Sequence, residues 1–146
     1  MDIYKSIVIN CKKEELWIWL TKFEKLKKWN KTIVEEQHIS NGEVGKGYKT
    51  RVLIKEGRRE NWYNNEILEY ERNNLLRIAL SGATLGKNDM TVEYLIKEKG
   101  EYAELFIKSH WKPSGLILKL FYPIIKIKAT KNTEEVLLEL KQQIEK

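Results

Sequence analysis

Between Trp29 and Trp111 the sequence reads as a run of short strands separated by turns. The turn residues are Asn41-Gly42, Glu56-Gly57, Asn73-Asn74, Gly82 to Gly86 and Lys99-Gly100. Turns this short join antiparallel neighbours, because a parallel crossover needs a dozen residues or more. Six consecutive strands connected in this way predict an antiparallel meander, and few folds accommodate one.

One face of the predicted sheet is apolar and the other is charged. Residues of the apolar face recur at every second position, the period of a half-buried strand. They are Tyr48, Thr50, Val52 and Ile54, then Leu76, Ile78 and Leu80, then Met90, Val92, Tyr94 and Ile96, and finally Leu105, Ile107 and Trp111. A sheet with one apolar face must cover that face with another element.

Residues 3–10 alternate in the same way and predict a further strand at the start of the chain. From Lys12 the period becomes helical, with Leu16 and Leu20 on one face of a first short helix. A second short helix brings Leu26 and Trp29 inward. The prediction is a seventh strand followed by a pair of short helices.

The C-terminal segment is the predicted cover for the sheet. Val136 or Leu137, Leu140 and Ile144 recur at helical spacing, and Ile124, Ile127 and Thr130 are expected to extend the same stripe backwards. Pro123 predicts a bend or a first turn, because proline inside a helix costs about 3 kcal/mol. A helix from Pro123 to Lys146 would be about 36 Å long.

Residues 115–127 carry more apolar side chains than burial against one sheet requires. No acid interrupts the segment from 112 to 131, which contains Lys112, Lys119, Lys126, Lys128 and Lys131. Four interpretations stay open: a gate to a pocket, contact with a second subunit, contact with a membrane surface, or burial under neighbouring loops.

The composition excludes several classes of protein. No apolar run approaches the roughly 20 residues of a membrane span, and the start MDIYKSIVIN does not resemble a secretory leader. Cys11 is the only cysteine, which rules out an internal disulfide and a cysteine zinc cluster. We therefore expect a cytoplasmic protein. The net charge of +6 is scattered among glutamates and forms no stripe typical of nucleic-acid binding, so no nucleic-acid partner is expected.

The order strand, two short helices, meander and long helix resembles the helix-grip fold of the START and Bet v 1-like (SRPBCC) superfamily. The residues that carry the resemblance are IYKSIVINCKKEELWIWLTKFEKLKKW, Gly47, EILEYERNN at 66–74, and Ser114-Gly115 through Pro123 to LLELKQQIEK. They are similar to the polyketide cyclase/dehydrase and lipid-transport branch. The resemblance implies an α+β fold, a seven-stranded curved antiparallel sheet around a long C-terminal helix, with residues 1–146 forming a single ligand-binding domain.

Superfamily membership also implies a cavity between sheet and helix for an apolar or amphipathic ligand. Inward side chains of such a fold often line that cavity, and aromatic ones offer an apolar face with a polar tip. The candidate ligand-binding residues are Trp29, Tyr48, Val52, Trp62, Tyr94, Trp111 and Phe121. Among these, Trp62 depends on strand four having no bulge, which would reverse its face.

Catalytic candidates are sparse. His38 and His110 lie in predicted strands outside any metal-ligand spacing, so surface or hydrogen-bonded roles are expected, with no metal and no cofactor. A carboxylate near the cavity could come from Asp89, Glu66 or Glu104.

Two further polar side chains are open at this stage. Either Asn64 or Asn65 points inward, and the period does not choose between them. Cys11 follows a strand and precedes a helix, where a packed thiol is expected rather than a reactive one.

The sequence therefore predicts binding or transport of a hydrophobic small molecule that is lipid-, polyketide- or isoprenoid-like. One alternative is a cyclase- or dehydratase-type enzyme acting on a polyketide or aromatic substrate. Another is a module that docks on a membrane or a partner through residues 112–131. The oligomeric state, monomer or homodimer, stays open.

Overall fold

The computed structural model describes residues 1–82, 90–112 and 116–146, without the side chains of residues 117 and 118. Its elements are β1 (Asp2–Ile9), α1 (Lys13–Thr21), α2 (Phe23–Trp29), β2 (Ile33–His38), β3 (Lys49–Glu56), β4 (Arg59–Glu71), β5 (Leu75–Ser81), β6 (Met90–Lys99), β7 (Tyr102–Trp111), α3 (Leu116–Leu120) and α4 (Tyr122–Glu145). This order confirms the predicted strand, helix pair, meander and C-terminal helix.

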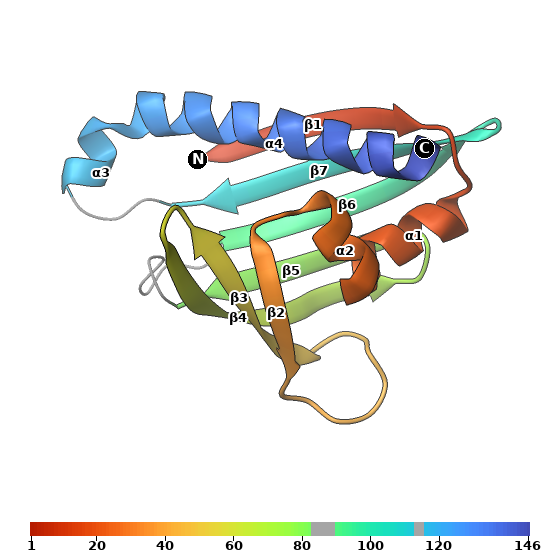
Figure 1. Ribbon diagram of the computed structural model, residues 1–146, viewed down its shortest axis with the longest axis horizontal. Coiled ribbons are helices and arrows are strands. Elements are labelled where there is room, and N and C mark those ends of the chain that lie inside the picture. The colour runs from red at the N-terminus through yellow and green to blue at the C-terminus, as the bar shows by residue number, and fades with distance from the viewer. Residues whose placement is uncertain (83–89, 113–115) are drawn as a thin grey trace.

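All the strands belong to one antiparallel sheet with the order β1-β7-β6-β5-β4-β3-β2. Strands β2 to β7 form the predicted meander, and β1 adds to it beside β7. Residues with positive φ close the tight turns at Gly57, Asn73 and Gly100, a conformation that glycine and asparagine tolerate best. Of the predicted break at 82–86, all but Gly82 lies outside the described residues. Helix α4 runs along the sheet, which is the helix-grip arrangement (Figure 1).

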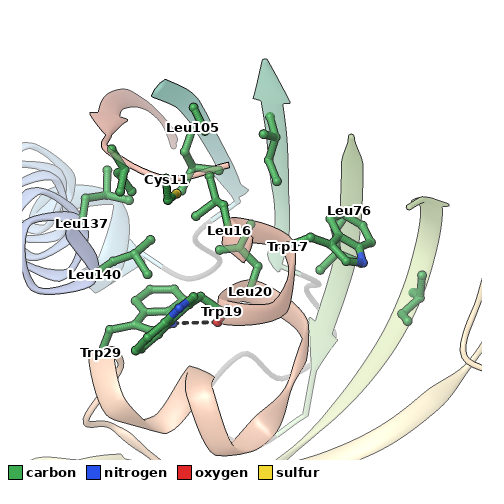
Figure 2. Packing of buried hydrophobic residues seen from close by; sticks show 14 residues of the cluster. Cys11, Leu16, Trp17, Trp19, Leu20, Trp29, Leu76, Leu105, Leu137 and Leu140 are labelled. Carbon is green, nitrogen blue, oxygen red and sulfur yellow. Dashed lines mark hydrogen bonds between the residues drawn. The ribbon is translucent and has the colours of Figure 1, made fainter. Parts of the chain in front are cut away.

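The main core lies where α1 and α2 meet the sheet and the C-terminal half of α4. Leu16 and Leu140 are completely buried, and Leu137 is nearly so (Figure 2). The indole of the buried Trp29 donates a hydrogen bond of 2.9 Å to the carbonyl of Trp19, near the end of α1. Since a carbonyl at a helix end lacks its usual helical partner, this bond fixes α2 against α1.

The C-terminal helix is interrupted at the position that Pro123 predicts. Helix α3 ends at Leu120, Phe121 leaves helical geometry with φ −93° and ψ 7°, and Pro123 then lies in the first turn of α4. Proline is tolerated there because the first amides of a helix have no intrahelical partner. The break separates a short first piece from a long second one.

The inward stripe of α4 differs from the one expected. Leu137 and Leu140 face the core as predicted, but Ile124 and Ile127 are 65% and 71% exposed. Ile124 precedes the inward-facing Thr133 by nine residues, or about two and a half turns, and so points to the opposite side of the helix. The expectation that Ile124 and Ile127 continue the core stripe is therefore wrong.

Polar contacts hold the second half of α4 against β1 and the residue after it. Lys141 donates to the carbonyl of Val8 at 2.7 Å and also to Glu145, while Glu145 accepts from the amide of Asn10 at 3.2 Å. The hydrogen bond from Lys141 is the main cause that lowers the pKa of Glu145. These contacts fasten α4 at its C-terminal end.

None of the helices in the described residues has the length and apolar character that crossing a membrane requires.

Candidate functional site

A cavity of about 370 Å³ lies between the apolar face of the sheet, α1 and α2, and the middle of α4. Strands β2 to β7 contribute to its wall, and α4 contributes Asn132, Thr133, Val136 and Leu137. Most of the lining is aliphatic or aromatic: Leu20, Leu26, Trp29, Ile33, Val52, Ile54, Ile67, Leu76, Ile78, Leu80, Met90, Val92 and Ile107. Its size lies within the range of about 300–1,000 Å³ that is typical of small-molecule sites.

Four of the seven candidate ligand-binding residues line this cavity. They are Trp29, Tyr48, Val52 and Tyr94. Trp29 is the last residue of α2, Val52 and Tyr94 lie on β3 and β6, and Tyr48 immediately precedes β3. The cavity therefore brings together candidates that are up to 65 residues apart in the sequence.

Trp62 lies on the opposite face of the sheet. It pairs with Leu53, and the guanidinium of Arg51 stacks 5.0 Å from its ring centroid. A bulge between Ile67 and Glu69 shifts the alternation of β4, so the inward positions are odd before the bulge and even after it. The bulge therefore reverses the face of Trp62, and the expectation that Trp62 lines the cavity is wrong.

Trp111 and Phe121 are also outside the cavity lining. Trp111 pairs with Met90 and shares its sheet face, but it lies beyond the cavity's end. Phe121 is 53% exposed at the junction of α3 and α4.

A polar pair interrupts the apolar wall. Asn65 donates from Nδ2 to the hydroxyl of Thr50 at 3.1 Å, and the two residues face each other on β4 and β3. Its Oδ1 atom is buried and has no hydrogen-bond partner among the described residues. The inward asparagine is therefore Asn65 rather than Asn64, and it presents an unused acceptor in the cavity.

Other polar groups lie along the same face. Ser109 is 8% exposed and lines the cavity from β7. Burial raises the pKa of Tyr94 to about 12, so its phenol stays neutral at physiological pH. The wall thus offers hydroxyl groups as well as the Asn65 carbonyl.

Three ionisable side chains form a chain of contacts at the β2 edge of the cavity. Glu36 Oε1 lies 3.2 Å from His38 Nε2, and His38 Nδ1 lies 2.7 Å from the Tyr48 hydroxyl. Burial raises the pKa of Glu36, while the neighbouring His38 lowers it by a smaller amount. The imidazole side chain is 57% exposed, so the chain connects the cavity wall with solvent.

The model of one protein family, described as "Polyketide cyclase / dehydrase and lipid transport", matches residues 1–145. The chain belongs to this polyketide cyclase/dehydrase and lipid-transport family. A comparison with curated protein sequences found no match.

Solved structures support the fold of this family member. TTHA0849 from Thermus thermophilus is similar with a TM-score of 0.78 and 14% identity, covering 99% of this chain and 97% of the other. A START superfamily protein from Mycobacterium smegmatis has a TM-score of 0.75 at 14% identity, covering 99% and 97%. The di-domain ARO/CYC BexL from the BE-7585A biosynthetic pathway has a TM-score of 0.76 at 12% identity, covering 99% of this chain and 46% of BexL. At these identities the likeness shows the helix-grip fold alone.

The carboxylates predicted from the sequence are not the ones that this polyketide cyclase/dehydrase family member places at its cavity. Glu66 faces away from it and lies 3.9 Å from Lys49. Glu104 is also absent from the lining, and Asp89 lies outside the described residues. Glu36 takes the place expected for them.

The remaining candidates have structural settings. His110 contacts Asp2 on the outer face, and this hydrogen bond is the main cause that lowers the pKa of Asp2. Burial raises the pKa of Cys11 to about 11, as expected of a packed thiol. No group of three or more His, Cys, Asp or Glu residues in the described part of the chain is arranged to hold a metal ion.

Sequence reasoning missed Glu36 and the role of His38 because β2 has the sequence IVEEQH. Polar residues occupy both faces of this edge strand, and its register shifts between Ile33 and Glu35. Period alone therefore could not assign an inward face. In the structure His38 pairs with Thr50, and paired residues of neighbouring strands share a face. Because Thr50 was predicted to face inward, knowledge of this pairing would have placed His38 on the inward face as well.

Proposed function

We propose that residues 1–146 act as a single ligand-binding domain that binds or carries a hydrophobic small molecule of lipid-, polyketide- or isoprenoid-like character. The observation that carries this proposal is the largely apolar cavity of about 370 Å³ between the sheet and α4. Most of its lining residues lie on strands and helices, which favours a preformed site.

Binding is driven by the transfer of apolar ligand surface out of water. Each Å² that the ligand buries stabilises the complex by about 25 cal/mol, before the cost of immobilising the ligand is subtracted. Leu76, Ile78 and Val92 form the middle of the apolar wall. A ligand without apolar surface would gain little from this site.

The polar pair orients the ligand. Because the Oδ1 atom of Asn65 is a buried acceptor that no described residue contacts with a hydrogen bond, it favours a ligand that carries a hydroxyl or another hydrogen-bond donor. The nearby Thr50 hydroxyl already accepts from Asn65 and can donate as well. We therefore expect an apolar body with one polar end.

Native mass spectrometry of protein purified from cells, followed by titration with lipid and aromatic libraries, tests the proposal. Ile78→Trp should fill the cavity and abolish binding of the apolar fluorophore N-phenyl-1-naphthylamine. Leu53→Trp is the matched control, because Leu53 lies on the other face of the sheet opposite Trp62. Circular dichroism checks that both variants fold.

Loss of binding in Ile78→Trp alone would support the cavity as the site. Equal binding by both variants, or no ligand retained and none bound by the unmodified protein, would refute it.

We expect this binding to take place in the cytoplasm. Cys11, the only cysteine of the chain, is buried and has no partner for a disulfide, which suits a reducing compartment. Fractionation of cells with an antibody to the protein would check the location.

The second candidate function is acid–base chemistry on a polyketide or aromatic ligand, as in a cyclase or dehydratase. The specific observation in its favour is the contact chain of Glu36, His38 and Tyr48 at the cavity wall. The Tyr48 hydroxyl can pass its proton to His38 Nδ1 while its oxygen takes a proton from the ligand. Glu36 would then stabilise the imidazolium.

Deuterium uptake at the α-carbon of acetophenone, a slowly enolising aromatic ketone, tests this chemistry by mass spectrometry. Tyr48→Phe and Glu36→Gln should both lower the rate to that of buffer while leaving binding of the fluorophore intact. If the unmodified protein exchanges deuterium no faster than buffer, or if Tyr48→Phe exchanges it as fast as the unmodified protein, the proposed acid–base function is wrong.

A further inference from the structure

The junction of α3 and α4 exposes a group of large apolar side chains. Leu116 is 75% exposed, Leu120 70%, Phe121 53%, Ile124 65% and Ile127 71%. We call these five residues the α3–α4 surface. Monomeric proteins seldom expose so many large apolar residues together, and such groups usually mark an interaction site.

The five side chains lie on both sides of the helix break. Leu116 and Leu120 are four residues apart and share a face of α3, Ile124 and Ile127 are three apart and share a face of α4, and Phe121 lies at the junction between the two helices. Ile124 lies opposite Thr133, which lines the cavity. The surface therefore points away from the sheet, and Figure 1 shows α3 beyond the end of β7.

Lysines surround this surface and acids are absent from it. Lys112, Lys119, Lys126, Lys128 and Lys131 are all exposed, and no Asp or Glu occurs between 112 and 131. Lys128 and Lys131 each follow an apolar residue of the surface, Ile124 and Ile127, by four positions, which places them on the same side of α4. The next acid along the chain, Glu134, is paired with Lys5 at 2.6 Å.

The positive charge of the lysines around the α3–α4 surface indicates which kind of partner binds there. A second copy of the chain would bring two sets of lysines together around the apolar residues, and like charges that close repel. A bilayer containing anionic lipids offers the complementary arrangement, because its headgroups attract lysines and its acyl chains accept apolar side chains. The pattern is that of a helix lying in the membrane interface.

We propose that the α3–α4 surface docks on anionic membranes and that the cavity takes up or releases its ligand there. The leucine, isoleucine and phenylalanine side chains enter the acyl boundary while the lysines remain among the headgroups. This proposal rests on the proposed function, since it supplies the source or the destination of an apolar ligand.

The position of the cavity supports the connection. Helix α4 continues from the surface directly into the cavity wall, which begins at Asn132. The end of β3, the end of β5 and the start of β6 lie toward the same end of the molecule as α3 (Figure 1), and they contribute Ile54, Leu80 and Met90 to the lining. Docking would bring this end of the cavity close to the lipid.

Co-sedimentation of the full chain with vesicles tests the proposal. The protein should bind vesicles of phosphatidylcholine mixed with phosphatidylglycerol and should remain in solution with phosphatidylcholine alone. Lys128→Glu/Lys131→Glu should weaken binding by at least about 25-fold, since each basic residue contributes about fivefold at an anionic surface. Leu120→Ser/Ile124→Ser should weaken it by at least about tenfold.

Matched controls lie elsewhere on the protein. Leu138→Ser removes an exposed leucine, 53% accessible, from the same helix outside the surface. Lys46→Glu/Lys99→Glu reverses two exposed lysines, one in the loop before β3 and one at the end of β6. Both controls should bind vesicles like the unmodified protein.

No binding to anionic vesicles, or binding that survives both surface variants, would overturn the proposal. A dimer that light scattering detects and that Leu120→Ser/Ile124→Ser dissociates would also overturn it, because the surface would then join two copies. Binding of N-phenyl-1-naphthylamine in the absence of vesicles separates the two ideas. If that binding is intact while vesicle binding fails, only the membrane proposal is wrong; if the probe does not bind at all, the cavity proposal fails.

Discussion

Replacing the polar pair of the cavity by apolar residues of similar shape should stabilise the empty protein. The double substitution Thr50→Val/Asn65→Leu removes the 3.1 Å hydrogen bond together with the unpaired Oδ1 atom of Asn65. A buried pair replaced by matching apolar groups is nearly neutral or stabilising, whereas a buried group left without its partner is costly. The cavity should therefore be more stable without the groups that orient its ligand.

The magnitude follows from two opposing terms. Loss of the hydrogen bond costs about 1 kcal/mol, and removal of the unpaired buried carbonyl returns about 1–3 kcal/mol. The double variant should thus unfold at a free energy up to about 2 kcal/mol higher than that of the unmodified protein, which corresponds to a Tm up to about 8 °C higher. Thr50→Val alone leaves both ends of the Asn65 amide unpaired, so it should destabilise by about 1–3 kcal/mol.

Urea unfolding followed by circular dichroism measures both free energies. Titration with two matched ligands, a long-chain alcohol and the corresponding alkane, then measures the loss of orientation. The alcohol should bind the double variant about tenfold more weakly than it binds the unmodified protein, and the alkane should bind both equally.

The unfolding free energies of the double variant and of Thr50→Val test whether the Asn65 carbonyl is unpaired. If the double variant is no more stable than Thr50→Val, the carbonyl of Asn65 is satisfied in solution and our interpretation of it as a ligand group is wrong. Unchanged affinity for the alcohol would lead to the same conclusion.

Three further outcomes are expected. Burial raises the pKa of Glu36 above its ordinary value of 4.5, so the folded protein holds this proton more tightly than the unfolded chain and loses that stability as the pH rises through the shifted pKa. Glu36→Gln should therefore be more stable than the unmodified protein at neutral pH, and urea unfolding should show this difference shrinking as the pH falls from the shifted pKa to 4.5 and absent below 4.5. Because the pKa of Cys11 is raised to about 11, a colorimetric disulfide reagent at mildly alkaline pH should label it only in denaturant, and rapid native labelling would contradict its burial. Trp29→Phe should cost about 2–4 kcal/mol in unfolding free energy, since it leaves the Trp19 carbonyl unpaired in the core, whereas Trp62→Phe on the outer face should cost less than about 1 kcal/mol; equal effects would argue against the indole bond.

The fold could be predicted from the sequence because its determinants are local and repeated. Turn residues such as Gly57, Asn73 and Gly100 mark strand ends, and the period of two between them assigns one face. Each hairpin restricts its own register, so a meander follows without any long-range information. Pro123 likewise indicated the break in the C-terminal helix.

The site was harder to predict because it depends on where the period is broken. The bulge between Ile67 and Glu69 turns Trp62 outward, and nothing in the letters of β4 reveals the extra residue. On α4, apolar residues occupy more than one face, so Ile124 and Ile127 matched a stripe to which they do not belong. Glu36 was missed because β2 is mostly polar and has no apolar residues at every second position that would indicate its inward face.

The pairing of β1 with β7 has a consequence for the order in which the protein assembles. Strand β1 is synthesised before the other strands, yet the amine of Met1 donates to the carbonyl of Trp111, 110 residues later, at 2.6 Å. Closing so long a loop is slow compared with pairing the hairpins of the meander, and α4, which fastens to β1 through Lys141, is synthesised later still. During synthesis the part of the apolar face that α4 covers therefore stays exposed, whereas α1 and α2, which precede the meander, can already pack on the rest. A ligand present at that moment can be enclosed as the edge strand and the last helix are added together, without ever passing through an entrance.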